Sequence, residues 1–154
     1  MAPHMPVTPV IVTCPSCSTD NRVLPRQRAL PRCSACDTVL PWIVRADPGR
    51  FDEAIVAPIP VLVDLWAPWC SPCATVSPIV DLMGHEYAGR LKVVKLEIDR
   101  AYDVAKRYGV ESIPLLLILD DGREVDRVAG EITADTLREV LERHVPAGAG
   151  DPAV

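Results

Sequence analysis

The sequence predicts an α/β fold, a central mixed sheet flanked by helices, preceded by a small metal-binding module. Strand-like and helix-like segments alternate from residue 42 to residue 145, and an Asp-Gly pair marks one tight hairpin among them. The first part of the chain carries four cysteines but no periodic apolar pattern. The expected parts are a flexible N-terminus (1–9), the metal-binding module (10–40), the α/β domain (41–145) and a disordered tail (146–154).

The domain is expected to begin with a strand, a short helix and a second strand. Residues 42–45 read as a strand, and Asp47-Pro48 starts a helix that continues through residues 51–56. Residues 61–66 are apolar except for Asp64, which indicates a largely buried strand.

A long helix and a third strand follow. Residues 70–87 carry apolar side chains at helical spacing, and residues 91–98 alternate as a strand. Residues 101–108 then predict a short helix, which Gly109 ends.

The domain is expected to close with a hairpin and a helix. Residues 115–119 are all apolar, which is typical of a buried strand. Asp121-Gly122 supplies a tight turn into a strand at residues 124–129, and Thr133 caps the last helix.

Composition excludes several classes of protein. The 154 residues are 49% apolar and 24% charged with a net charge of −5, so neither disorder nor nucleic-acid binding is expected. No apolar stretch approaches the roughly 18 residues of a membrane helix, and no export signal opens the chain. We expect a cytoplasmic monomer with no nucleic-acid or membrane partner.

The first four cysteines have the spacing of a structural zinc site. Cys14, Cys17, Cys33 and Cys36 form C-x2-C-x15-C-x2-C. Two local disulfides are the alternative, but closing a four-residue loop contributes only roughly 2 kcal/mol, whereas structural zinc contributes about 10–16 kcal/mol. A segment this short without its own core needs the larger contribution. We predict Zn²⁺ with four thiolate ligands and no open position for catalysis.

Four arginines lie close to these cysteines in the sequence. Zinc with four thiolates has a net charge of −2, which nearby cations can balance. An ordinary solubilising role is equally open for this set, which is Arg22, Arg26, Arg28 and Arg32.

The third cysteine pair directly follows the strand at residues 61–66 and opens the long helix. Cys70 therefore lies at the helix N-terminus and Cys73 one turn further, on the apolar face. The helix dipole and free backbone N–H groups stabilise a thiolate at Cys70, and an i, i+3 pair can close a disulfide. We predict that Cys70 attacks a target disulfide and Cys73 resolves the intermediate. Half of a zinc site is the alternative, but no further pair remains to complete it.

Asp64 interrupts an apolar strand, where a buried carboxylate is costly. If helices cover that face, burial raises the pKa of Asp64 and makes it a proton acceptor for Cys73. Lys95, on the neighbouring strand, is the expected partner. A solvated edge position for Asp64 and an ordinary surface position for Lys95 remain open.

These motifs resemble the thioredoxin family, and specifically its zinc-ribbon members of the thioredoxin 2 type. The resemblance covers nearly the whole chain and implies a thioredoxin fold with an N-terminal zinc ribbon. Its carriers are Trp66-Ala-Pro-Trp-Cys70-Ser-Pro-Cys73, Pro78, Val94-Lys-Leu-Glu-Ile-Asp99, Ser112-Ile-Pro114 and Val128-Ala-Gly130.

The resemblance also implies roles for single residues. Asp64 becomes the buried acid with Lys95 as its partner, and Pro114 becomes a cis-proline that faces the disulfide. The implied catalytic residues are Cys70, Cys73, Asp64 and Lys95. The implied substrate-binding residues are Trp69, Ile113, Pro114 and Gly130.

Three residues depart from the family pattern. Ser71 replaces the usual glycine between the cysteines, which bears on thiolate stability and reduction potential. Ala74 stands where a basic residue often follows the motif, and Leu115 stands where threonine commonly follows the cis-proline. We expect a less cationic and more apolar substrate groove.

The resemblance implies a protein-disulfide reductase, a thiol-disulfide oxidoreductase that an NADPH-dependent, flavin-containing thioredoxin reductase regenerates. Zinc is the only cofactor expected on the chain. A second hypothesis is that the zinc module senses oxidants or binds clients. A third is a more oxidising, isomerase-like protein, because Ser71 can shift the potential.

Overall fold

The computed structural model describes residues 9–24 and 27–146. Most of the expected flexible N-terminus and disordered tail, residues 1–8 and 147–154, therefore lies outside the described residues. The strands are β1 (Val10–Thr13), β2 (Asp20–Val23), β3 (Trp42–Arg45), β4 (Val61–Trp66), β5 (Lys92–Glu97), β6 (Leu115–Asp120) and β7 (Arg123–Ala129). The α-helices are α1 (Phe51–Ala54), α2 (Ser71–Glu86), α3 (Tyr102–Arg107) and α4 (Ala134–His144).

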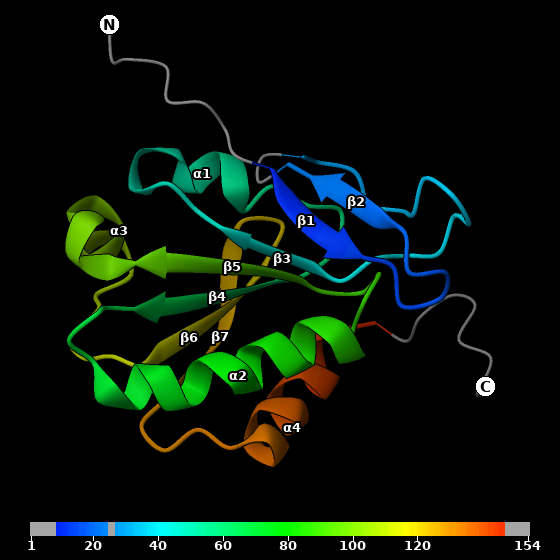
Figure 1. The fold of residues 1–154 in the computed structure, drawn as a ribbon. Helices are drawn as coiled ribbons and strands as arrows, with labels where there is room; N and C mark the ends of the chain where they lie inside the picture. The colour runs from blue at the N-terminus through cyan, green and yellow to red at the C-terminus, as the bar shows by residue number, and fades with distance from the viewer. Residues whose placement is uncertain (1–8, 25–26, 147–154) are drawn as a thin grey trace, which may run out of the picture.

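A mixed five-stranded sheet forms the centre of the domain (Figure 1). Its strand order is β3-β5-β4-β6-β7, with β3, β5 and β4 parallel and β6 and β7 antiparallel to their neighbours. The turn between β6 and β7 contains Asp121 at φ 52° and Gly122 at φ 78°. Positive φ at both residues suits the tight hairpin that the Asp-Gly pair predicted.

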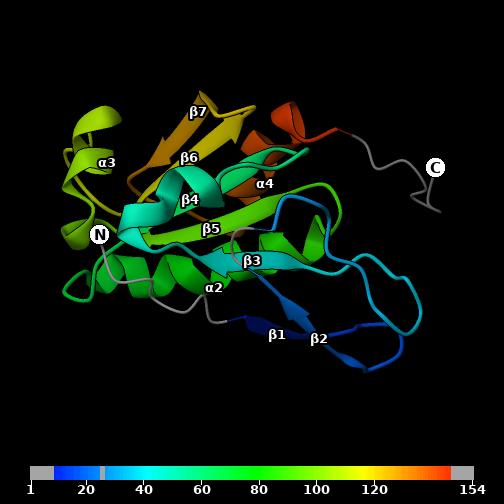
Figure 2. The ribbon, with the colours of Figure 1, turned by 90° about the horizontal axis from the view of Figure 1, so that it is seen from above.

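Helices cover both faces of this sheet (Figures 1 and 2), which confirms the predicted architecture. One face packs against α1 and α3 through side chains such as Val63, Leu65 and Phe51. The other packs against α2 and α4 through side chains such as Leu62 and Val80. Alternation along β4 therefore sends even-numbered residues, Asp64 among them, towards α2.

The first helix is shorter than the sequence predicted. The helix expected through residues 51–56 is only Phe51–Ala54, preceded by a 3-10 turn at Pro48–Arg50. The Asp47 side chain starts this turn by accepting a hydrogen bond from Gly49 N at 2.9 Å. Because four residues cannot hold a helix alone, α1 depends on the burial of Phe51 and Ala54.

The N-terminal module is a two-stranded antiparallel ribbon, β1 with β2, that lies next to β3 (Figures 1 and 2). Cys14, Val23 and Leu40 are buried in the same cluster as Trp42 of β3. The ribbon shares the core of the domain, because it has too few apolar residues for a core of its own. Among the described residues, no helix combines the length and the hydropathy needed to cross a membrane.

Candidate functional site

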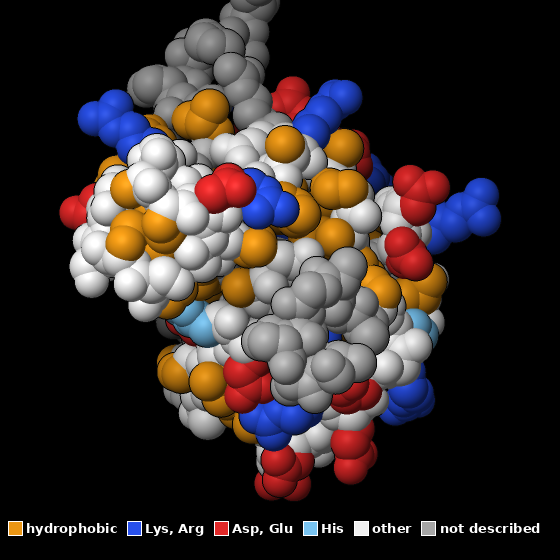
Figure 3. Space-filling view, turned by 90° about the vertical axis from the view of Figure 1, so that its right-hand side faces the viewer, with side chains coloured by type: hydrophobic (Ala, Val, Ile, Leu, Met, Phe, Trp, Pro, Cys, Tyr) orange, Lys and Arg blue, Asp and Glu red, His pale blue; other side chains and the backbone are white. Residues whose placement is uncertain are grey.

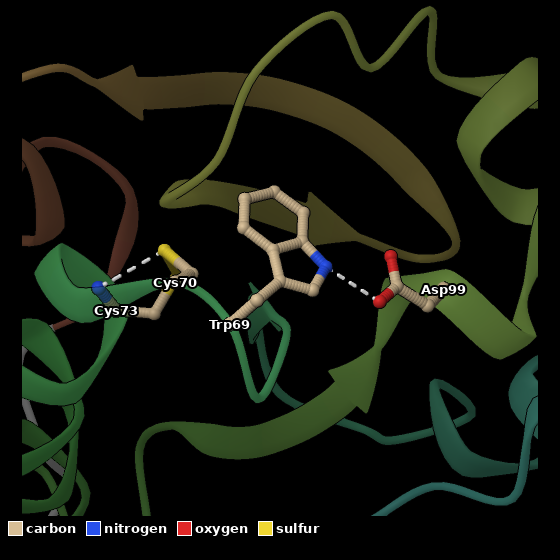
Figure 4. Close-up of a disulfide and its surroundings, with 4 residues drawn as sticks. All are labelled: Trp69, Cys70, Cys73 and Asp99. Atoms are coloured by element: carbon tan, nitrogen blue, oxygen red, sulfur yellow. Dashed lines mark hydrogen bonds between the residues drawn. A yellow bond between two sulfur atoms is a disulfide. The ribbon is translucent and has the colours of Figure 1, made fainter.

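The disulfide lies at the end of β4, where α2 begins. Cys70 is the N-cap of α2 and is bonded to Cys73, with the Cα atoms 5.3 Å apart. The Sγ of Cys70 accepts a hydrogen bond from Cys73 N at 3.2 Å (Figure 4). Pro72 lies in the first turn, where a residue without an N–H is tolerated. After reduction, the helix N-terminus and this backbone donor favour a thiolate on Cys70 rather than on Cys73.

The residues expected to border the substrate groove differ in exposure. Trp69 is 68% exposed, and Figure 4 shows its indole beside the disulfide. Ile113 packs against the two cysteines, and a cis peptide bond joins it to buried Pro114. Gly130 is exposed at φ 82°, and a Cβ there would meet nothing within 4 Å. Open backbone at Gly130 leaves room for a bound chain.

Asp99 holds the indole of Trp69 and was not predicted from the sequence. Trp69 Nε1 donates to Asp99 Oδ2 at 2.6 Å (Figure 4). Asp99 follows β5, and the carboxyl ends of parallel strands meet at one edge of a sheet. Asp99 and Trp69 therefore follow strands that end at the same edge of the sheet, and this placement could have indicated the contact from the sequence.

Asp64 is a buried carboxylate without a hydrogen-bond partner. It is 1% exposed, and neither Oδ1 nor Oδ2 has a partner. Burial raises the pKa of Asp64 to about 6, and Asp81 adds to the rise while Lys95 and Arg45 oppose it. A group of this kind can accept a proton near neutral pH.

Lys95 does not form the direct pair with Asp64 that the sequence predicted. The two residues are in register on β5 and β4, but Lys95 Nζ contacts Asp81 Oδ1 at 2.6 Å and donates to Ser77 Oγ at 2.8 Å. The long side chain reaches up from the sheet to α2, where half-exposed Asp81 pairs with the ammonium nearer to solvent.

Two residues of α2 near the disulfide escaped the sequence analysis. Cys73, Ser77 and Asp81 are spaced by four, so they lie on one face of α2. This spacing, visible in the sequence, places the Ser77 hydroxyl and the Asp81 carboxylate on the same helix face as Cys73.

A pocket of about 260 Å³ opens beside the disulfide. Its lining residues are Arg45, Trp66, Ala67, Pro68, Cys70, Cys73, Ala74, Ser77 and Lys95. None of Trp69, Ile113, Pro114 and Gly130 lines it. The disulfide is therefore accessible from a second side, away from the expected groove.

The four ribbon cysteines converge at the tips of two turns. The Sγ atoms of Cys14 and Cys36 are 3.6 Å apart, those of Cys17 and Cys33 are 3.5 Å apart, and all four lie within 4.8 Å of one another. Zn–S bonds of about 2.3 Å in a tetrahedron place sulfurs about 3.8 Å apart. The four thiols therefore have the geometry to bind a metal ion of this kind.

The two turns share one backbone conformation. Cys14 Sγ accepts from Ser16 N, and Cys33 Sγ accepts from Ala35 N, each at 3.4 Å. The residue after the second cysteine has positive φ in both turns, 64° at Ser18 and 62° at Asp37. Backbone hydrogen bonding, chiefly from Cys36 N–H, lowers the pKa of the Cys33 thiol to about 6. The second turn thus favours the thiolate form of Cys33, which is the metal-binding form.

Asn21 connects the two turns and was also missed by the sequence analysis. This buried side chain donates to Thr19 O at 3.0 Å and accepts from Ser34 N at 2.9 Å. Its amide fixes the second turn relative to the first without adding charge.

On the face seen in Figure 3, basic side chains of the described residues lie among acidic ones. Arg32 donates to Asp37 O at 3.2 Å, and its guanidinium lies 3.7 Å from Asp37 Oδ2. Arg32 therefore supports the second cysteine turn through Asp37.

Comparison with known proteins gives one consistent result for the domain. The Thioredoxin family model matches residues 42–143. Thioredoxin 1 of Nostoc sp. is 46% identical over 93 residues, covering 60% of this chain and 87% of that protein. Thioredoxin of Synechocystis sp. is 44% identical over 100 residues, covering 65% and 94%. A chloroplastic M-type thioredoxin of Pisum sativum is 42% identical over 98 residues, covering 63% and 57%.

Proposed function

The chain belongs to the thioredoxin family, and from that premise we propose that it reduces disulfide bonds of client proteins through Cys70 and Cys73. The observation that supports this most directly is the disulfide at the N-terminus of α2, next to exposed Trp69. A reducible pair of sulfurs at a helix N-terminus, beside an open surface, is suited to thiol-disulfide exchange.

The exchange requires two attacks and one proton transfer. The Cys70 thiolate attacks one sulfur of the client disulfide, and the other client sulfur leaves as a thiolate. Cys73 then loses its proton and attacks Cys70 Sγ, which releases the second client thiolate and leaves the Cys70–Cys73 disulfide. Two electrons pass from the protein to the client.

Asp64 is the proposed acceptor of the Cys73 proton. Its burial, its unpartnered oxygens and a pKa raised to about 6, chiefly by desolvation, support this role. Lys95 is proposed to act on Asp64 by its charge rather than by direct contact. Trp69, Ile113, Pro114 and Gly130 are proposed to contact the client.

The proposed electron source is an NADPH-dependent thioredoxin reductase, which returns the disulfide to the dithiol. We assign this partner from family membership. A reducing compartment suits both the dithiol and four free ribbon thiols, so we propose a cytoplasmic location.

The proposed metal of the ribbon is Zn²⁺, held by Cys14, Cys17, Cys33 and Cys36. Their convergence within 4.8 Å supports it. When bound, the ion would cross-link the two turns, and with four thiolates it would leave no position for water or substrate. Its role would be structural, in a module that otherwise shares the core of the domain.

A redox-sensing role for the ribbon is a second candidate, favoured by the exposure of Cys17 and Cys36. Oxidants can reach these two sulfurs, and a metal site that loses thiolates releases its ion. Zinc release on mild peroxide treatment, together with altered client affinity, would support this function. Retained zinc and unchanged turnover under the same treatment would contradict it.

The reductase function is tested by the reduction potential of the Cys70–Cys73 pair against glutathione. We expect a value close to the thioredoxin range of about −270 mV and NADPH-dependent reduction of a protein disulfide with thioredoxin reductase. A potential near about −180 mV would show instead that Ser71 has produced an isomerase-like protein.

A further inference from the structure

Two neighbouring hollows lie between the disulfide and the N-terminal ribbon. The pocket beside the disulfide and a second hollow of about 430 Å³ share Arg45 and Lys95 as lining residues. The second hollow lies between β1 (Val10–Thr13) and β3 (Trp42–Arg45), with Asp81 and His85 of α2 on its wall. We call these two neighbouring hollows together the Arg45 cleft.

The Arg45 cleft has a small residue on its wall beside the disulfide. Ala74 lines the pocket directly after Cys73. Trp66 and Ser77 line the same pocket. Cys70 and Cys73 line this part of the cleft and Trp69 and Ile113 do not, so the cleft approaches the disulfide from outside the expected groove.

Arg45 gives the cleft a positive charge available for binding. Its guanidinium carbon lies 5.9 Å from the ring centroid of Trp66, and among the described residues it forms no ion pair. Lys95, by contrast, is engaged with Asp81 and Ser77. A guanidinium without an ion pair can bind a carboxylate through two parallel N–H donors.

The two strands along the cleft have unpaired edges. Among the described residues, β3 is an edge strand of the five-stranded sheet, and β1 pairs with β2 alone. Both strands line the hollow. An extended polypeptide is the ligand that can use such edges, because its backbone supplies the matching donors and acceptors.

We propose that the Arg45 cleft binds an extended segment of the client protein and that Arg45 pairs with an acidic side chain of that segment. The inference rests on the proposed disulfide-reductase function and gives it a substrate preference, for clients with a carboxylate close to the reactive cysteine. The ribbon strand β1 is the outer wall of this site.

Disulfide peptides that differ in one residue test the charge preference. The probes are peptide disulfides with Glu, Gln or Lys at each of the four positions on either side of the cysteine, reduced by the full-length dithiol protein. At one position or more, we expect Glu to raise kcat/KM about two- to fivefold over Gln, and high salt to remove the gain.

Variants of Arg45 assign the preference to this residue. Arg45→Gln should bring the kcat/KM of Glu peptides down to that of Gln peptides measured with the same variant, and Arg45→Glu should favour Lys peptides instead. The comparison within each variant cancels any effect of Arg45 on Asp64. Arg123→Gln, the same change on exposed β7, is the matched control and should retain the gain. A Glu preference that survives Arg45→Gln, or no preference at any position, would overturn the proposal. If no peptide at all is reduced, the proposed function itself fails.

The role of the ribbon wall is tested with two exposed ribbon residues. Ile11 lines the cleft and is 56% exposed, whereas Leu24 is 43% exposed and does not line it. Ile11→Asp should repel Glu peptides and lower their kcat/KM about twofold or more, and Leu24→Asp should not. Equal rates for the two variants would show that the client segment does not run along β1.

Discussion

In the ribbon, the two C-x-x-C units lie in turns, and each sulfur finds its neighbour in the other unit; in the domain, Cys70-Ser-Pro-Cys73 begins a sixteen-residue helix and the sulfurs bond to each other. The spacing is the same in all three. The backbone after the second cysteine differs, because Ser18 and Asp37 turn the chain with positive φ, whereas the chain after Cys73 continues as helix. The local conformation, rather than the spacing, separates a cluster of four free thiols from a bonded pair.

The buried polar group beside each site also differs. Asp64, on the face of β4 that packs against α2, is a carboxylate without partners, whereas Asn21 between the ribbon turns is an amide with its hydrogen bonds made. A carboxylate with a raised pKa can gain and lose a proton, but an amide cannot. The redox region keeps a group that can change its charge, and the ribbon keeps one that holds its neighbours in place.

The largest expected difference between the regions is in turnover. Cys70→Ser should reduce the NADPH-coupled reduction of a protein disulfide below detection, because it removes the attacking thiolate. Cys73→Ser should accumulate mixed disulfides with clients, which non-reducing gels and mass spectrometry would reveal. Substantial turnover by Cys70→Ser would contradict the assigned roles.

Removing one ribbon thiol should weaken metal binding and destabilise the ribbon, but it should leave disulfide exchange at Cys70 and Cys73 largely unchanged. If the ribbon holds zinc as proposed, Cys33→Ser should lose it, measured by metal analysis. The variant should also lose the hydrogen-exchange protection of β1 and β2, because the proposed metal would supply most of the ribbon's folding free energy. Turnover of a small neutral disulfide should stay within about twofold. Ser16→Ala, in the same kind of turn but without a ligand atom, is the control. Loss of turnover in Cys33→Ser alone would show that the two regions are not independent.

Asp64→Asn should make the protein more stable at high pH but less active. The folded-state pKa of about 6 lies above the ordinary value of 3.8, so the folded protein keeps a proton that the unfolded chain loses. Stability therefore falls as pH rises from about 4 to about 6, by about 3 kcal/mol in total. Asparagine does not titrate, so the stability of the variant does not fall in this way. In urea unfolding of the oxidised proteins, the free energy of unfolding of the variant should equal that of the wild type at pH 4 and exceed it by up to about 3 kcal/mol at pH 8. Its resolving step should be slower.

An equal stability difference between wild type and Asp64→Asn at the two pH values would show that Asp64 does not titrate in this window. A variant that resolves mixed disulfides at the wild-type rate would show that another group takes the Cys73 proton.

Most of the domain was predictable because its elements follow local rules. The strands at Trp42–Arg45 and Val61–Trp66 and the cap at Thr133 agree with the sequence patterns. Periodicity, turn residues and caps act over a few residues, and the sequence displays them directly. The position of Cys70 at the N-terminus of α2 was predictable for the same reason.

The details that escaped prediction depend on contacts between distant segments. Lys95 pairs with Asp81 because α2 packs against β5 with that carboxylate within reach of the ammonium. No local sequence pattern encodes how the helix packs on the strand. The hydrogen bond from Trp69 to Asp99 likewise joins segments that follow two different strands, β4 and β5. The short α1 differs for a related reason, since tertiary burial rather than helix propensity stabilises it.

The smallest expected effect is a lower pKa of Asp64 when its neighbour Asp81 loses its charge. Asp81 pairs with Lys95, and its own charge also helps to raise the pKa of Asp64. Asp81→Asn removes this charge and leaves Lys95 free to act on Asp64, so the pKa of Asp64 should fall, by up to about one unit. Carboxyl-carbon NMR titration of the oxidised protein measures this directly. Asp103→Asn, the same change on α3 across the sheet, should leave the titration in place; if Asp64 titrates alike in both variants, the Asp81–Lys95 pair does not set its charge.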